Sequence, residues 1–248
     1  MNEVQNRFQA GDQAVDRQGG GGRGLLRGVS AFTLIEMLTV IAVIGLLAGM
    51  AVGLAPRVGR ANRESRIRAQ LNQIATAIES YKADSGDYPP DNVLPNTDPP
   101  VVNPIVSSLF YELSSVVISN RPGNPYFHTR DRSEQISPTV VRQFFNADGF
   151  VNAKEDPKEL KRPYLQFHPK QYAEISTTPD VEVLVVPVPW PVKRSDPPVS
   201  GKPGLNPWRY VSTRPTNNAT SFDLWAEWVE GGKVKVLSNW AKDVQDRD

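Results

Sequence analysis

The amino-acid sequence predicts an α+β protein in which a long N-terminal helix packs on a small C-terminal antiparallel β-sheet. Three observations predict this class. Residues 31–55 are almost wholly apolar, residues 56–84 continue with apolar side chains at helical spacing, and residues 146–248 hold several short segments of β-type composition. With 248 residues and 39% apolar content, the chain has room for one modest globular domain beside the helix.

Residues 1–31 are predicted to be a cytosolic leader. They are polar and glycine-rich and hold too few apolar side chains for a core. Arg23 and Arg27 precede the apolar run, as in an export signal. A signal peptide cleaved near residues 49–51 is the alternative, against which Glu36 and the continuing helical pattern argue.

Residues 32–55 are predicted to be the membrane-spanning half of the helix. At about 1.5 Å of rise per residue, the run is long enough for a hydrocarbon core of about 30 Å. Glu36 stands inside this run, where an isolated charge costs about 3 kcal/mol or more, so we expect it to have a role. The alternative is that its carboxylate reaches the cytosolic headgroups.

Residues 56–84 are predicted to be the amphipathic half of the same helix. Apolar side chains recur at spacings of three and four, with polar residues between them. One face therefore needs a partner surface, and Gly86 and Pro89-Pro90 end the helix. The apolar positions are Ile67, Leu71, Ile74, Ala75, Ile78 and Tyr81.

Residues 85–145 are predicted to be a proline-rich variable region on the surface. Of the 22 prolines, all but Pro56 lie between Pro89 and Pro215, which disfavours long regular elements there. The segment SSLFYELSSV (residues 107–116) is predicted to form one short helix.

Residues 146–248 are predicted to be a β-rich region whose apolar face covers the helix. The last two strand segments flank Glu230-Gly231-Gly232, a sequence typical of a hairpin turn. The predicted strands are 164–167, 181–188, 208–212, 222–229 and 234–237.

The composition argues against several function classes. The 28 basic and 27 acidic residues give no overall field, so no nucleic-acid partner is expected. There is no cysteine, and His128 and His168 stand in no catalytic or metal-binding spacing, so we predict that the chain is not an enzyme.

The tryptophans are assigned to a core or a subunit contact, with stacking on sugars or bases as the alternative. They are Trp190, Trp208, Trp225, Trp228 and Trp240.

The start of the apolar run resembles a known processing site. The sequence Ala31-Phe32-Thr33-Leu34-Ile35-Glu36 is similar to that of type IV pilins and type II secretion pseudopilins. The resemblance implies that a prepilin peptidase cuts after Ala31 and methylates Phe32. Residues 81–89, 206–211, 222–224 and 238–240 resemble the major pseudopilins, which implies a pilin-like version of the α+β fold with a large middle insertion.

The same resemblance implies a function. The chain would be a structural subunit of a pseudopilus, single-pass in the bacterial inner membrane, with its N-terminus in the cytosol and its C-terminal domain in the periplasm. The implied partners are other copies of the chain, the prepilin peptidase, the secretion platform, minor pseudopilins and membrane lipid. The alternatives are a type IV pilin for adhesion, motility or DNA uptake, and a membrane-anchored binding domain that does not polymerise.

Glu36 is predicted to be the assembly residue. Cleavage before Phe32 creates a charged amine near the membrane-embedded end of the helix, and an unpaired charge in apolar surroundings is costly. If subunits stack with a small axial stagger, Glu36 of one copy meets the Phe32 amine of its neighbour and sets the register.

No cofactor is predicted, and calcium is the one for which the sequence offers candidate residues. Major pseudopilins hold calcium in an acidic loop, but Lys233 and Lys235 occupy the corresponding loop here, so that site is not transferred. A second candidate matches part of an EF-hand loop, although Phe144 stands at its first position; a glycine turn is the alternative. Its residues are Asn146, Asp148, Asn152 and Glu155.

A basic stripe follows the apolar run and conflicts with the rule that positive charge stays in the cytosol. We expect it to pair with acidic groups of adjacent subunits or with lipid phosphates, or else to be a solvated face. It consists of Arg57, Arg60, Arg63, Arg66 and Arg68.

Overall fold

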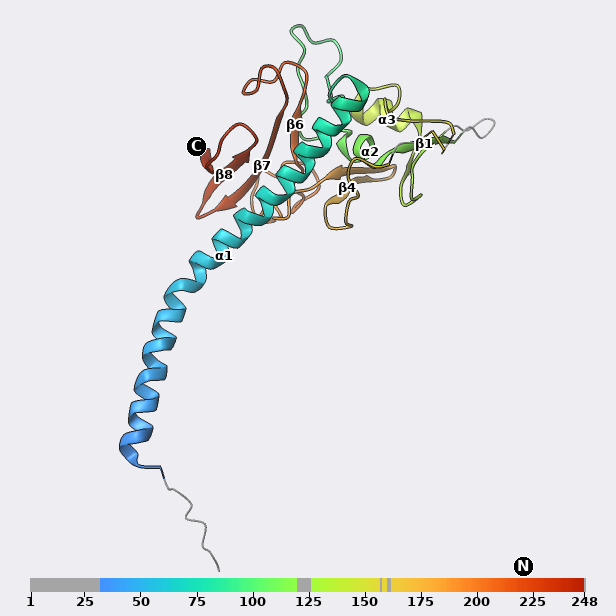
Figure 1. Ribbon diagram of the computed structural model, residues 1–248. Helices are drawn as coiled ribbons and strands as arrows, with labels where there is room; N and C mark the ends of the chain where they lie inside the picture. Colours follow the sequence, from blue (N-terminus) through green and yellow to red (C-terminus); the bar gives the residue numbers. More distant parts are fainter. Residues whose placement is uncertain (1–31, 120–125, 157, 160–161, 248) are drawn as a thin grey trace, which may run out of the picture. The chain divides into compact units, whose positions relative to one another are not determined.

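Helix α1 (Leu34–Ser85) is the first element of the computed structural model, which describes residues 32–119, 126–156, 158–159 and 162–247, with the backbone alone at residues 51–57 (Figure 1). The chain divides into two units, Met1–Gly53 and Leu54–Asp248. Helix α1 contributes residues to both units.

The second unit contains three antiparallel sheets among its described residues. The first has the strand order β1 (Val116–Ser119), β2 (Tyr126–Thr129) and β3 (Gln135–Ile136), and the second pairs β4 (Tyr172–Thr177) with β5 (Asp180–Leu184). The third runs in chain order through β6 (Arg209–Val211), β7 (Asp223–Glu230), β8 (Lys233–Ser238) and β9 (Gln245–Arg247).

Two short helices complete this unit. They are α2 (Leu109–Ser114) and α3 (Pro138–Phe145). Helix α3 has local signals at both ends: the hydroxyl of Ser137 accepts a hydrogen bond from the Val140 N–H (3.4 Å), and Asn146 ends the helix in the left-handed conformation at φ 53°. Helix α3 is therefore specified largely by its own sequence.

The β7–β8 hairpin is closed by the predicted turn. Glu230 pairs with Lys233, and the two residues between them, Gly231 and Gly232, have φ of 59° and 81°. Positive φ at both central positions matches the turn type that favours glycine and suits the twist of a hairpin. The hairpin prediction is confirmed.

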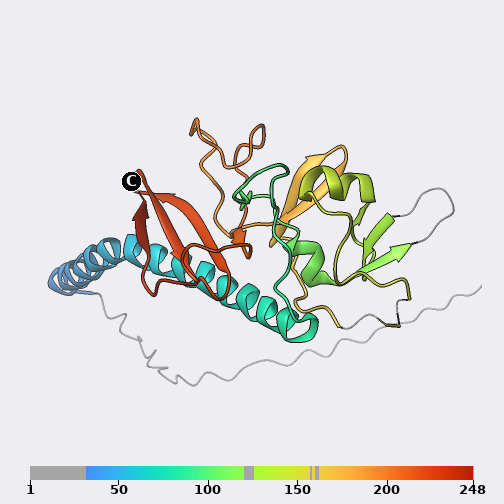
Figure 2. The ribbon, with the colours of Figure 1, turned by 90° about the horizontal axis from the view of Figure 1, so that it is seen from above.

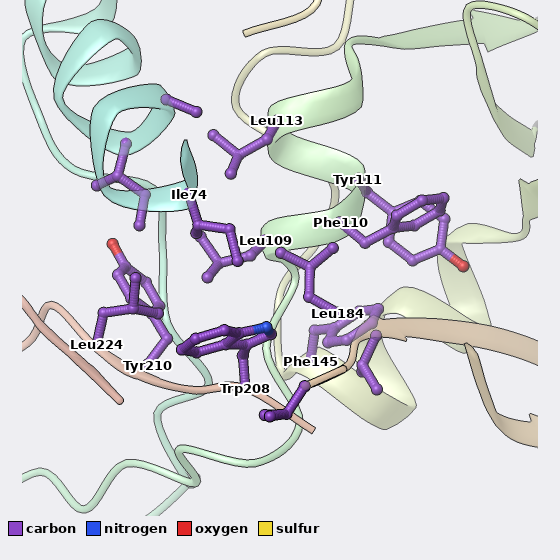
Figure 3. Close-up of a cluster of buried hydrophobic side chains, with 14 of the residues drawn as sticks. Ile74, Leu109, Phe110, Tyr111, Leu113, Phe145, Leu184, Trp208, Tyr210 and Leu224 are labelled. Carbon is purple, nitrogen blue, oxygen red and sulfur yellow. The ribbon is translucent and has the colours of Figure 1, made fainter. Parts of the chain in front are cut away.

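The core lies between residues 67–81 of α1, the β6–β9 sheet and α2. Figures 1 and 2 show the β6–β9 sheet alongside this part of α1, while α2, α3 and the two smaller sheets gather at its C-terminal end. The close-up in Figure 3 places Ile74 beside Leu109 and Trp208, side chains from distant parts of the chain. The predicted apolar stripe is buried here, with Ile67, Ile74 and Ile78 fully inaccessible.

The fold class predicted from the sequence is wrong as a whole. The structure is a mixed α/β arrangement with three antiparallel sheets, not a helix packed on one small C-terminal sheet. Among the described residues, no helix combines the length and the apolar character needed to cross a membrane, so the predicted membrane-spanning half at residues 32–55 is not supported. Much of the difference arises because residues 85–145 were predicted to lie on the surface.

The middle of the chain contributes to the core instead. Residues 109–114 form α2 and residues 116–119 form β1, and α3 follows two further strands. Leu109, Leu113 and Val116 are fully buried. These strands are short and flanked by prolines, so their pattern in the sequence is weak, and long-range packing decides their conformation. Residues 164–167, predicted as a strand, form none.

Candidate assembly surface

The apolar surface of the first unit is its main feature. Twelve large apolar side chains between Phe32 and Met50 are 45–82% exposed. They occupy successive turns on every side of the helix, and Glu36 is the only charged residue among them. A helix that is apolar all round needs an apolar environment or other protein surfaces around it, because so large a patch is rarely left in water.

Glu36 and Thr33 cap the start of α1. The backbone N–H and the hydroxyl of Thr33 both donate to Oε2 of Glu36, at 2.8 and 2.7 Å. In return, the hydroxyl of Thr33 accepts a hydrogen bond from the backbone N–H of Glu36 at 3.3 Å. This reciprocal arrangement is a capping box, which satisfies backbone donors that the first turn of a helix leaves open.

Both donors from Thr33 reach the same oxygen of Glu36. Within the described part of the chain, no residue donates a hydrogen bond to the other oxygen, Oε1, so the carboxylate retains an acceptor for a further donor. The capping role of Thr33 was not predicted, although the spacing Thr-x-x-Glu is itself the capping-box signature.

The processing residues lie at the edge of the described structure. Ala31 and the leader, residues 1–31, are outside the described residues. Phe32 precedes α1 and its side chain is 72% exposed. The predicted cleavage point therefore directly precedes an accessible residue and the capped helix start.

Some arginines of the basic stripe form ion pairs with carboxylates of the same chain, and others are exposed to solvent. Arg60 and Arg63 both approach Oε1 of Glu230 at the end of β7, at 3.6 and 3.3 Å, and Arg68 lies 3.5 Å from Glu64. Arg66 is exposed, and the side chain of Arg57 is outside the described part. Two of the arginines thus tie α1 to the β7–β8 hairpin, a role that the sequence did not reveal.

Three of the four calcium candidates are directed to different protein partners. Asn146 donates to Oδ1 of Asn92 (2.6 Å), Asp148 accepts two hydrogen bonds from the guanidinium of Arg142 (2.9 and 2.7 Å), and Asn152 donates to the carbonyl of Glu112. Glu155 follows the bridge between Val117 and Lys154. In the described residues, no cluster of three or more acidic or histidine side chains is arranged for a metal ion. Calcium binding stays a prediction without support from these contacts.

Glu112 is a buried acid that the sequence did not single out. Its carboxylate accepts hydrogen bonds from the Tyr81 hydroxyl (3.0 Å) and from the N–H groups of Val151 (2.9 Å) and Asn152 (3.3 Å). Burial nevertheless dominates and raises the pKa of Glu112 to about 7. The residue connects α1, α2 and the loop after α3, and its place is in the core rather than at a surface where a ligand binds.

The tryptophans divide into two groups. Trp190, Trp208 and Trp228 are buried, with at most 4% of their surface exposed. Trp225 and Trp240 are half-buried and lie edge to face, with ring centroids 5.6 Å apart. The first three tryptophans are therefore core residues, as predicted. Trp225 and Trp240 instead line an open groove on the C-terminal sheet.

No protein family, curated protein or solved structure matches this chain in comparisons of sequence and structure.

Proposed function

We propose that this chain is a structural subunit of a bacterial pilus-like filament, most similar to a type II secretion pseudopilin, processed by a prepilin peptidase and assembled through its N-terminal helix. The observation that carries the proposal is the all-round apolar surface between Phe32 and Met50. Packing several such helices together buries this surface without further folding of each chain.

The capping box supports a specific role for Glu36 in that assembly. Oε2 holds the Thr33 donors and thereby fixes the direction of the carboxylate, while Oε1 stays available. A free amine at Phe32 of a neighbouring copy is a suitable donor for this oxygen. The ion pair sets the axial register, because any other stagger leaves both charges unpaired in an apolar bundle.

The proposal places the chain at the bacterial inner membrane before assembly, with its N-terminus in the cytosol and Leu54–Asp248 outside. Lipid surrounds the apolar surface of the first unit until other copies of the chain replace it. Protease treatment of spheroplasts checks this arrangement: the second unit is expected to be digested, and a protected second unit contradicts it.

The decisive experiment separates the capping role of Glu36 from its charge. Glu36→Gln keeps an oxygen that accepts from Thr33 but removes the negative charge, whereas Thr33→Ala removes the cap and keeps the charge. Filaments are sheared from cells that express the secretion or pilus machinery and are quantified by sedimentation. We expect Glu36→Gln to abolish filaments and Thr33→Ala to retain most of them.

The control is Glu79→Gln, which removes an exposed carboxylate from the second part of α1. It is expected to assemble normally. Normal filaments from Glu36→Gln would refute the register mechanism. Mass spectrometry of the mature N-terminus tests processing separately, because a chain that begins at methylated Phe32 is expected and an intact leader contradicts it.

A further inference from the structure

The outer face of the C-terminal sheet contains a groove that the filament proposal does not use. Leu224, Ala226 and Trp228 of β7 point into the core, so the alternation of a strand directs Trp225 and Glu227 to the opposite face. The groove on that face has a volume of about 610 Å³, within the range of sites for small ligands.

Two aromatic rings pack against each other in this groove, those of Trp225 and Trp240. The indole N–H of Trp225 donates to Oε1 of Glu227 at 3.0 Å, which fixes the orientation of that ring. Next to Trp240, Asn239 donates from its N–H to the Leu224 carbonyl (3.0 Å) and accepts the Leu224 N–H through its side chain (3.0 Å). The edge-to-face pair of Trp225 and Trp240 is therefore preorganised and loses little entropy when a ligand binds.

The carboxylates of the groove are already neutralised or hydrogen-bonded by the chain itself. Asp223 accepts from Asn217 and Asn218, and Glu227 lies 3.2 Å from Arg209 and 2.5 Å from Arg247. Asp246 pairs with Lys233 and Lys235, and the hydrogen bond from Lys235 is the main reason that the pKa of Asp246 is lowered. A cationic ligand thus finds no unpaired carboxylate.

An anionic ligand fits no better. Arg247 is the one cationic side chain in the lining of the groove, and its guanidinium already pairs with Glu227, so a phosphate or sulfate finds no unpaired cation there. The remaining hydrogen-bonding groups on the walls are neutral hydroxyls and amides, from Thr216, Asn217 and Gln245. The groove thus suits a ligand that is neutral and rich in hydroxyls and that also has an apolar face.

We infer that this groove binds a neutral carbohydrate, with one sugar ring against Trp240 and Trp225 and its hydroxyls on Asn217, Gln245 and Arg247. A pyranose has these properties, because its C–H groups form an apolar face that packs on an aromatic ring while its hydroxyls point outward to polar side chains. The site adds a binding activity to the subunit and does not depend on whether the chain polymerises.

The test uses the full chain in detergent micelles. Binding is measured by calorimetry with the neutral hexasaccharides of maltose, cellobiose and chitobiose type, and with heparin and polygalacturonate as anionic probes. We expect at least one neutral oligosaccharide to bind and the anionic probes not to bind. Trp240→Ala is expected to weaken binding about tenfold or more, the loss of one aromatic contact.

Two further variants complete the test, one inside the groove and one outside it. Gln245→Ala removes an exposed polar side chain of β9 and is expected to weaken binding without affecting the core, even if Trp240→Ala destabilises the fold. Phe167→Ala removes a half-buried ring outside the groove and is expected to bind normally. The inference is overturned if the folded chain binds none of the neutral sugars, binds only the anionic probes, or binds equally well after both groove substitutions.

Discussion

At the scale of single residues, buried acids shape the pH dependence of the second unit. Glu112 is 1% exposed, and its pKa rises to about 7 from an ordinary value of 4.5 because burial disfavours the charged form. The folded state therefore holds a proton that the unfolded state releases between about pH 4.5 and pH 7. The contribution of Glu112 to stability is fully present below pH 4.5 and is lost as the pH rises through about 7.

This residue provides the first prediction. The free energy of unfolding of the wild-type chain should fall between pH 5 and pH 8, and Glu112→Gln should remove on the order of 2 kcal/mol of that fall, because glutamine carries no charge to bury. Urea titrations at both pH values measure the difference. Glu159→Gln, which removes an exposed carboxylate, should leave the pH dependence of the free energy of unfolding unchanged. If Glu112→Gln also leaves it unchanged, Glu112 is excluded as its cause.

The ion pair of Arg209 and Glu227 carries a second prediction. Both side chains are about 5% exposed and their charged groups lie 3.2 Å apart. Burial lowers the pKa of Arg209 to about 10, yet the guanidinium stays charged at neutral pH. Removing one partner leaves the other charge buried with fewer contacts.

Arg209→Met should therefore destabilise the chain by about 3 kcal/mol, whereas the double variant with Glu227→Met should lose less than the sum of the two single changes. Chemical denaturation of the wild type, the two single variants and the double variant gives the coupling energy between Arg209 and Glu227. Additive losses would mean that the two charges stabilise the fold independently.

At the scale of elements, glycine is favoured in the turn between β7 and β8 but disfavoured inside helix α1. Gly232 has a φ of 81°, where a side chain is strained. Gly59 lies inside α1, and an added Cβ there would have no atom within 4 Å apart from its chain neighbours and the nearby helix backbone. The same substitution should consequently have opposite effects at the two positions.

Gly232→Ala should destabilise the chain by about 1 kcal/mol, and Gly59→Ala should stabilise it by about 0.5–1 kcal/mol, because alanine favours the helix. Thermal denaturation of both variants provides the comparison, with each serving as the other's control. Equal signs for the two changes would contradict the assigned backbone conformations.

At the scale of the whole molecule, the buried core and the exposed apolar surface belong to different units. Among the residues whose side chains the structure describes, every buried apolar residue of the core lies at or beyond Ile67. A fragment that begins at Leu54 should therefore fold and stay monomeric, with a melting temperature close to that of the second unit in the full chain. Circular dichroism and size-exclusion chromatography check both points, and an unfolded fragment would show that residues 32–53 are needed for folding.

The sequence alone determined the features that depend on local pattern. The spacing of apolar residues between Ile67 and Tyr81 predicted the buried stripe of α1, and Glu230-Gly231-Gly232 predicted the hairpin, because side-chain period and permitted φ are properties of a few neighbouring residues. The Thr-x-x-Glu spacing of the capping box is likewise local, but the cap that Thr33 and Glu36 form was not predicted.

Only the tertiary structure decided the rest. Three features depend on contacts between segments tens of residues apart: whether residues 109–119 and 126–145 belong to the core, that the carboxylate of Glu112 is buried, and that Trp225 and Trp240 are only half-buried. Such contacts form where the free energy of the whole packed unit is lowest, and short strands with weak local preference follow that packing instead of their own sequence.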